Sequence, residues 1–583
     1  MRTAMLHRKL MIGWAALASQ IGMMVSGAHA ADFDGSSMLF ARMAAQTQQG
    51  SPRRPEFHRM SAQGTSVAVD GRAAELQTPL GSVWKLFVYA YAIDRAIPMP
   101  DYRCRGGDAA KEEIYCCNPE QSVTRDAALV QSCGLFFEPA RLHLDAQDWS
   151  RYWASKAPQA TWLAELAQLK PARKVSVSSL LQALASIDGV ARERTEAALL
   201  GVVLNGRGQS ALRYLGGRYR VKTYTWNHPQ RPDSVIGGAA GWMSDGSAVW
   251  FGALGSSLQV LQDYAKQLAN AAEGSGSQAQ HGRCVDVAMF ASYPLRSVSA
   301  LPDGKVLQPG AAEDLRGRFR IEFANGKKLL MQSDNEMRLG WNARGQPVLT
   351  ARLNEDEYIA RVIDREANAA NREAARALGV AARTYLLQNA AQHGECMAIA
   401  DSSRTQRVSP NAASEAARDI AAFTAGLVLQ GVNAQYRLHA AEENVLSWQR
   451  AVELSKAGML FDQILQHEFA QASLASVNGE VECKPMPVAE RWLRTQARQW
   501  RQVLQTEPGF AEPRVQVCQL SFGNPYSDLS RQRIYVRGLV SLNHRLTLAH
   551  EYLHLAFSAY PSGQDENYIE QWARRLIEGE SRS

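Results

Sequence analysis

The sequence predicts a multidomain α+β protein whose globular parts follow one another along the chain. Its 583 residues are 46% hydrophobic, which is enough for several cores. A Gly/Ser/Gln-rich stretch at 273–278 and a polar stretch at 476–479 divide this length. Strand-type alternation follows the first stretch, and helix-type sequence dominates from Glu355 onward. We therefore expect three domains, at 31–275, 285–475 and 480–583.

Residues 1–30 have the layout of a cleavable secretory signal peptide. Basic residues precede an apolar run, which ends at a small-x-small cleavage site, Ala28-His29-Ala30. No later stretch is long and apolar enough to span a bilayer. The formal net charge of +7 includes the leader and is too mild to indicate a nucleic-acid partner. We expect an exported, soluble protein in the periplasm of a Gram-negative-type cell.

The chain has eight cysteines, and an exported protein can keep them as disulfides. Four lie close together at 104, 116, 117 and 133, and four are scattered at 284, 396, 483 and 518. They lack the repeated CxxC spacing of a structural zinc site. We expect disulfides rather than metal ligands, with the pairing left open by the sequence.

An HExxH sequence, His550 to His554, lies inside an apolar-periodic run near the C-terminus. On a helix the two histidines lie on one face and can share one Zn²⁺, and Glu551 is then placed as a general base. A second helical segment begins near Asp565, where Glu566 is the preferred third ligand and Glu570 the runner-up. The alternative is two ordinary histidines on an amphipathic helix. This combination resembles compact glutamate-zincin peptidases, a resemblance that implies a small helix-rich domain.

Ser82 and Lys85 form an SxxK pattern at the start of an apolar helix near residues 86–93. One helical turn brings the lysine amine toward the serine hydroxyl, where a neutral lysine can act as base for acyl transfer. Short Ser/Lys patterns are common, so the pattern alone is weak.

Two later segments add to this pattern. Residues 131–137 resemble the serine-x-asparagine segment of penicillin-binding proteins and serine β-lactamases. Residues 221–225, followed by the strand-like 248–254, resemble the lysine-threonine-glycine strand of that family and its neighbour. The resemblance covers about 76–254 and implies an α/β domain. Gly134 replaces a polar amide, and Tyr224 replaces the glycine that lets substrate backbone approach.

The same resemblance implies a role for each matching residue. Ser82 would be the nucleophile and Lys85 its base, Ser132 would relay a proton, and Lys222 with Thr223 would bind a carboxylate. The two substitutions leave an active domain and a binding-only domain as alternatives.

A helical segment from Leu353 to Glu366 runs into an alanine-rich segment near 374–386 that suits close packing. Glu366 lies at the end of the first helix, where a cleft can form, although it also fits a surface carboxylate. The run resembles the stage II sporulation protein D family of lytic transglycosylases over about 287–474. The resemblance implies an α+β domain in which Glu366 is the acid that cleaves the glycan strand. Residues 437–443 depart from the family's serine- and glycine-rich segment.

The three-part order also resembles a family of exported bacterial proteins named only as a domain of unknown function. Taken together, the patterns predict a periplasmic envelope protein that acts at peptidoglycan, with other envelope proteins as candidate partners. The leading hypothesis is zinc-dependent hydrolysis of a peptide or amide bond at the C-terminal site. The alternatives are lytic cleavage through Glu366 and a non-catalytic peptidoglycan-binding scaffold.

Overall fold

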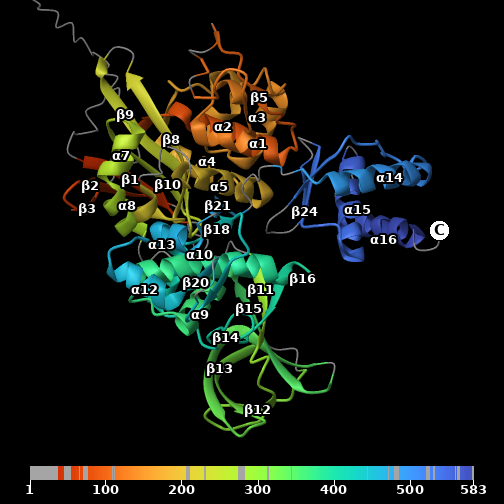
Figure 1. The fold of residues 1–583 in the computed structure, drawn as a ribbon. Helices are drawn as coiled ribbons and strands as arrows, with labels where there is room; N and C mark the ends of the chain where they lie inside the picture. Colours follow the sequence, from red (N-terminus) through yellow and green to blue (C-terminus); the bar gives the residue numbers. More distant parts are fainter. Residues whose placement is uncertain are drawn as a thin grey trace, which may run out of the picture.

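The computed structural model describes residues 37–580, with longer gaps at 45–53, 70–75, 205–210, 273–282, 478–482 and 520–524 and with shorter gaps elsewhere. The expected leader 1–30 and linker 273–278 lie outside the described residues. The architecture is mixed α+β, as the sequence predicts. Figure 1 shows two sheet-containing bodies packed together and a smaller helical body set apart at the C-terminal end. None of the helices described could cross a membrane, because none is both long and apolar enough.

The first region is built on a six-stranded antiparallel sheet in the order β3-β2-β1-β10-β9-β8. Its strands are β1 (Ser37–Met43), β2 (Glu56–Ser61), β3 (Ser66–Ala68), β8 (Tyr219–His228), β9 (Arg231–Met243) and β10 (Ala248–Leu254). The strands expected at 221–225 and 248–254 are therefore present as β8 and β10. They are not neighbours, however, because β9 pairs with both.

Helices cover both faces of this sheet (Figure 1). The helices of this region are α1 (Trp84–Asp94), α2 (Arg125–Gln131), α3 (Ala146–Lys156), α4 (Val177–Ala185), α5 (Gly189–Leu204), α6 (Leu212–Leu215), α7 (Ser257–Asp263) and α8 (Ala265–Ala272). Short strand pairs join β4 (Gln77–Pro79) to β7 (Lys174–Ser176) and β5 (Tyr102–Arg103) to β6 (Ser122–Val123). The expected helix after Ser82 is α1, which is buried along most of its length.

The second region has a seven-stranded sheet in the order β12-β13-β14-β15-β11-β17-β16. Its strands are β11 (Cys284–Met289), β12 (Leu295–Ala300), β13 (Leu315–Phe323), β14 (Lys328–Trp341), β15 (Pro347–Asn354), β16 (Ala391–His393) and β17 (Cys396–Ala400). Its helices are α9 (Glu355–Glu366), α10 (Arg372–Asn389), α11 (Glu415–Phe423), α12 (Trp448–Lys456) and α13 (Phe461–Glu468). Two short pairs, β18 (Leu427–Gln430) with β21 (Ser473–Ser476) and β19 (Gln435–Arg437) with β20 (Val445–Ser447), complete it.

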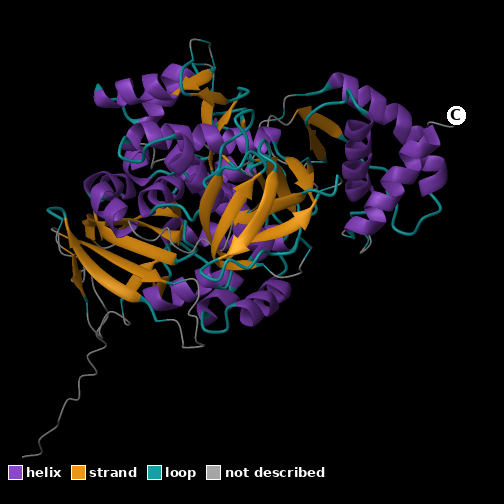
Figure 2. Ribbon diagram, turned by 90° about the horizontal axis from the view of Figure 1, so that it is seen from below, coloured by secondary structure: helices purple, strands orange, loops and turns teal. Residues whose placement is uncertain are grey.

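The alanine-rich helix α10 is buried on two faces. Ala374, Ala377 and Ala381 belong to a core that also contains side chains of β1, β8 and β10. Ala375 and Ala382 face a second core, which lies against the sheet of the second region. Figure 2 shows helices lying between the two larger sheets. The segments 31–275 and 285–475 therefore share a continuous core across their junction.

The last region is small and helix-rich, and it has a core of its own. It consists of α14 (Pro487–Leu504), α15 (Leu542–Ala556), α16 (Glu566–Glu580) and a three-stranded sheet of β22 (Gln516–Gln519), β24 (Arg533–Val536) and β23 (Tyr526–Asp528). The HExxH sequence lies on α15, as expected, and α16 packs against it.

All eight cysteines are paired, which confirms the expectation of disulfides. The pairs are Cys104–Cys117, Cys116–Cys133, Cys284–Cys396 and Cys483–Cys518. Each pair lies within one of the three regions, so no disulfide joins one region to another. The junction between the first two regions rests on packing and polar contacts instead. There the Gly217 N–H donates to the carbonyl of Phe423 at 2.6 Å, and Arg218 forms an ion pair with Asp419.

The close approach at Gly217 gives a test of the shared core. A Cβ atom at this position would lie 2.1 Å from the carbonyl oxygen of Ala425, which is backbone and cannot move aside freely. We expect Gly217→Ala to destabilise the first two regions by about 1–3 kcal/mol, seen as a lower thermal unfolding midpoint. Gly340→Ala is the matched control, because nothing lies within 4 Å of its Cβ position. Equal midpoints for the two variants would contradict the shared core.

Candidate functional site

Glu366 is the last residue of α9, and contacts at both ends of the helix hold its carboxyl in place. Asn354 caps the helix start by accepting from the Glu357 N–H at 2.7 Å, and the first turn is acidic, which suits the positive end of the helix dipole. At the other end, the Arg407 N–H donates to Oε1 of Glu366 at 2.8 Å, and Arg407 Nε lies 3.5 Å from the same oxygen. The side chain of Glu366 keeps 15% of its surface exposed.

Aromatic hydroxyls and one buried amide surround this carboxyl. The Tyr436 hydroxyl lies close enough to Glu366 to lower the pKa of its carboxyl in part. The Nε2 of Gln406 donates to the Tyr436 hydroxyl at 2.9 Å, and the Tyr358 hydroxyl donates to Oε1 of Gln406 at 2.6 Å. Tyr385 packs edge-on against Tyr436 with ring centroids 6.2 Å apart. Gln406 is fully buried, so the chain of hydrogen bonds holds the Tyr436 hydroxyl toward Glu366.

Burial raises the pKa of Glu366, although the Arg407 backbone N–H, the Tyr436 hydroxyl and the Arg407 guanidinium each lower it in part. The neighbouring carboxyls behave differently. Burial would also raise the pKa of Glu357, but hydrogen bonds from Arg418 and Arg361 outweigh it and the pKa is lowered. Glu366 is therefore the carboxyl in this part of the domain that is suited to keep and give a proton.

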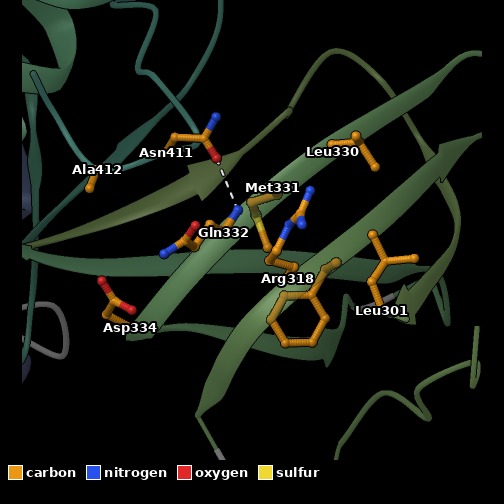
Figure 3. A pocket seen from close by; sticks show the side chains of 9 residues that line it. Leu301, Arg318, Leu330, Met331, Gln332, Asp334, Asn411 and Ala412 are labelled. Atoms are coloured by element: carbon orange, nitrogen blue, oxygen red, sulfur yellow. Dashed lines mark hydrogen bonds between the residues drawn. The ribbon is translucent and has the colours of Figure 1, made fainter. Parts of the chain in front are cut away.

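The loop that carries Arg407 continues to a hollow of about 340 Å³ beside β13 and β14 (Figure 3). The side-chain oxygen of Asn411 accepts from the Gln332 N–H at 3.0 Å and ties the loop to β14. The hollow combines apolar surface from Leu301 and Leu330 with the polar side chains of Arg318 and Asp334. Four peptide units separate Arg407 from Asn411, so the two lie within roughly 14 Å of each other.

The Ser82–Lys85 pair is formed as the sequence predicts. Lys85 Nζ donates to Ser82 Oγ at 3.0 Å, and burial lowers the pKa of Lys85 to about 8. Ser82 lies in a short 3-10 helix, Gly81–Val83, just before α1, and it is partly exposed. A hydroxyl beside a lysine that loses its proton easily is the arrangement that nucleophilic acyl transfer needs.

The later segments of the pattern differ in how close they lie to Ser82 and Lys85. Gly134 lies beside Lys85, since a Cβ atom there would be 3.8 Å from Lys85 Cε. Ser132 caps the C-terminal end of α2 with a left-handed backbone, φ 71°. Tyr224 fills the space that a glycine would leave open. A Cβ atom on Gly81 would lie 2.7 Å from Tyr224 Cβ, and the Tyr224 hydroxyl lies 3.2 Å from the Thr78 hydroxyl.

Lys222 and Thr223, the expected carboxylate-binding pair, are neighbours on β8. Lys222 is fully buried, and its Nζ donates to the carbonyl of Thr223 at 3.2 Å. Side chains alternate along a strand, so Thr223 lies on the face of β8 opposite to Lys222 and Tyr224. The carboxylate-binding role expected of Lys222 and Thr223 stays a prediction.

This geometry generates a prediction for Ser82. A fluorescent penicillin should label the wild-type protein and fail to label Ser82→Ala, while Ser186→Ala, which changes a serine of the same region, should keep the label. Labelling should speed up as the pH rises through about 8, because only neutral Lys85 can accept the hydroxyl proton. Label that persists in Ser82→Ala would remove this serine as the nucleophile.

The two histidines on α15 face one another. His554 Nε2 lies 3.1 Å from His550 Nε2. Two nitrogen ligands of one tetrahedral zinc ion stand roughly 3.3 Å apart, so this separation fits a shared ion. Glu551, between them in sequence, is mostly buried, with 8% of its surface exposed.

Beside the two histidines, the described side chains offer no third ligand for a metal ion. Glu570 Oε2 lies 3.2 Å from Nδ1 of His550, the ring nitrogen that points away from His554, and its other oxygen pairs with Arg574 at 2.6 Å. Through this contact Glu570 can orient the ring of His550. The side chain of Glu566 lies outside the described residues. Within the described part of the chain, no group of three or more His, Cys, Asp or Glu residues could hold a metal ion.

Known sequences place the chain in a family. Residues 108–233 and 444–562 match the family described as a predicted secreted protein (DUF2300). Residues 344–458, which include Glu366, match the family described as stage II sporulation protein. The chain is 41% identical over 524 residues to the uncharacterized protein YfaQ of Escherichia coli strain K12, a match that covers 90% of this chain and 93% of the relative. The chain belongs to the YfaQ family.

The two family matches contain different residues of the candidate sites. The stage II sporulation match contains Glu366, Gln406, Arg407 and Tyr436. The secreted-protein match contains the HExxH sequence but ends before Glu566. The two descriptions together indicate that this YfaQ relative is an exported protein with a role at the cell envelope.

Solved β-lactamases are among the structures similar to this YfaQ relative. A class D enzyme from Bacillus subtilis is 11% identical, and the match covers 41% of this chain and 92% of that chain with a TM-score of 0.27. A class D enzyme from Sebaldella termitidis is 10% identical and covers 41% of this chain and 89% of that chain with a TM-score of 0.25.

Sequence reasoning missed two features of these sites. Gln406 lies within a segment that matched the sporulation family, but only its full burial between two tyrosines shows that it positions Tyr436. The role of Glu570 was also missed, since spacing along a helix does not tell which imidazole nitrogen a carboxylate meets. The position of Glu570 was a usable signal, because it lies one turn after Glu566 on the helix that packs against α15.

Proposed function

We propose that this exported protein cleaves the glycan strands of peptidoglycan, with Glu366 as the acid. The observation that carries the proposal is the buried, hydrogen-bonded carboxyl of Glu366, whose pKa is raised, inside the segment that matches the stage II sporulation family. A carboxyl that remains protonated and still reaches solvent can give its proton to a glycosidic oxygen.

The residues around Glu366 suit both halves of such a reaction. Glu366 gives its proton to the bridging oxygen as the bond to the sugar C1 breaks. In a lytic reaction the C6 hydroxyl of the same sugar then attacks C1 and returns its proton to Glu366, so no water is consumed. Between these steps the carboxylate is charged, and the Arg407 N–H and the Tyr436 hydroxyl stabilise it by hydrogen bonds. The hollow beside Asn411 offers further surface along which a sugar polymer can lie.

The proposal predicts activity that depends on Glu366 and not on a metal. Wild-type protein incubated with purified peptidoglycan should release anhydro-muropeptides, with or without a chelator. Glu366→Gln should lower the rate by at least about 10²-fold, because the amide cannot give the proton. Glu415→Gln, which changes an exposed carboxyl of the same region, should leave the rate unchanged. Binding to sacculi without soluble products would support the scaffold alternative instead.

The pH profile provides a second measurement on the same site. The acid form of Glu366 is required, so the rate should fall as the pH rises through its raised pKa. Tyr436→Phe removes a hydrogen bond that lowers this pKa, so the pKa should rise further and the fall in rate should move to higher pH. A shift to lower pH, or no shift, would contradict the assignment of Tyr436.

The C-terminal site supports a second candidate function, zinc-dependent hydrolysis of a peptide or amide bond. The observation that favours it is the 3.1 Å separation of His550 Nε2 and His554 Nε2. Glu570 contacts the other ring nitrogen of His550, Nδ1, and can orient that ring. His550, His554 and Glu566 would hold the ion, which when bound supplies a Lewis acid for a carbonyl. Glu551 would take a proton from the attacking water as general base.

Metal analysis of purified protein tests this candidate. We expect zinc in the wild type, loss of zinc in His550→Ala and in Glu566→Gln, and a roughly 10–100-fold weaker affinity in Glu570→Gln, because the latter only orients a ligand. Glu578→Gln on the same helix is the control and should bind as the wild type does. Equal zinc content in the wild type and His550→Ala would end this proposal.

A further inference from the structure

Three arginines form a row on the exposed face of the sheet in the second region. Arg316, Arg318 and Arg320 alternate along β13, so their side chains leave the same face of the sheet at steps of roughly 7 Å. All three are exposed, whereas Phe319 and Ile321 on the opposite face are buried in the core. Figure 1 shows β12 and β13 at the end of the molecule, away from the helices. The arginine row is therefore open to a partner from solution.

The arginine row differs from the other exposed arginines of this sheet, three of which have a carboxylate partner. These pairs are Arg296–Glu322, Arg338–Asp314 and Arg352–Asp286. Among the contacts of the described residues, no member of the arginine row forms an ion pair. Like charges that stand beside one another on a sheet repel. An anionic partner would relieve this repulsion.

The strands beside β13 supply one carboxylate for the three guanidinium groups. On β14 the residues in register with the arginine row are, in order, Asp334, Gln332 and Leu330. On β12, Ser299 is in register with Arg320. Asp334 can offset one positive charge at most, so a net positive charge remains along the row.

The composition of this face indicates what kind of anion it suits. The planar guanidinium group of arginine matches carboxylates and phosphates. Regularly spaced cations suit a polymer that carries several anions, because weak contacts along one molecule reinforce each other. A bilayer surface would need a larger exposed apolar area, and Leu330 is the one apolar residue among the strand partners named above. The arginine row therefore fits a water-soluble polymer better than a membrane.

The arginine row is continuous with the surface that leads to the proposed acid. Arg318 belongs to the row and also lines the hollow beside Asn411 (Figure 3). The loop through Asn411 also carries Arg407, whose N–H donates to Glu366. A polymer that lies in the hollow would therefore contact the row while it extends toward the acid.

We propose that the arginine row binds the free carboxylates of the peptide stems of peptidoglycan. The choice of this polymer rests on the function proposed above, because cleavage of the glycan strands brings the protein to it. The stems recur along each strand and carry free carboxylates, which suits several guanidinium groups in a row. Contacts to the stems leave the sugar backbone free to enter the site at Glu366. The arginine row would thus make the protein prefer strands that keep their stems.

Cosedimentation with purified sacculi tests the proposal on the full-length mature protein. The parent protein carries Glu366→Gln, so that binding is measured without cleavage. Changing Arg316, Arg318 and Arg320 together to Gln should weaken binding at least about tenfold, because three modest charge contacts are lost at once. The matched control changes three exposed arginines of α14 to Gln and removes the same charge; these are Arg491, Arg494 and Arg498. The control should bind as the parent does.

Two further ligands identify the chemistry that the row recognises. Sacculi whose free carboxylates have been converted to amides should bind the parent protein at least about tenfold more weakly, a result that needs no change in the protein. Vesicles that contain phosphatidylglycerol should bind less well than untreated sacculi. Thermal unfolding midpoints identify any variant that fails to fold.

The proposal is overturned if the parent protein does not bind sacculi or binds the anionic vesicles in preference. It is also overturned if the amidated sacculi, or a folded protein without the arginine row, give unchanged binding. An equal loss in the α14 control would show a general effect of charge and would overturn it too. Binding is measured with Gln at position 366, so it stands or falls separately from glycan cleavage, which the release of anhydro-muropeptides reports.

Discussion

The burial of α10 on two faces is the constraint on which the first two regions depend. A helix between two cores must be narrow, which explains why its sequence is rich in alanine and has Gly379 at its middle. A Cβ atom on Gly379 would lie 3.0 Å from the Thr424 hydroxyl, so even one methyl group is tight. Larger residues along α10 would separate the two sheets and open the junction.

The same helix sets the position of the acid. Arg383 on α10 pairs with Glu355 and Asp356 in the first turn of α9, where burial alone would raise the pKa of Glu355 but Arg283 and Arg383 lower it. The carbonyl of Ala382 accepts from Gln406, which in turn holds Tyr436 toward Glu366. Contacts with α10 therefore position both ends of α9. The carboxyl of Glu366 is held by this packing and not only by the loop that carries Arg407.

The sequence predicted the local patterns correctly. It did not predict the contacts between segments that are distant in the chain. The helix at α10, the Ser82–Lys85 pair and the HExxH helix follow from spacing, because each is decided within one or two turns. The shared core and the four disulfide pairings could not be derived, because they join residues far apart in the chain. Strand alternation alone places Thr223 on the face of β8 opposite to Lys222 and Tyr224, and the family motif does not show this.

The three sites are coupled to different degrees by this architecture. The acid at Glu366 lies on α9, which shares a core with α10, and α10 also belongs to the core at the junction of the first two regions. The C-terminal region has its own core and its own disulfide, and its histidines are oriented by a glutamate from within that region. Its geometry is therefore set locally. Changes at the junction should alter the first two regions while leaving the separation of His550 and His554 unchanged.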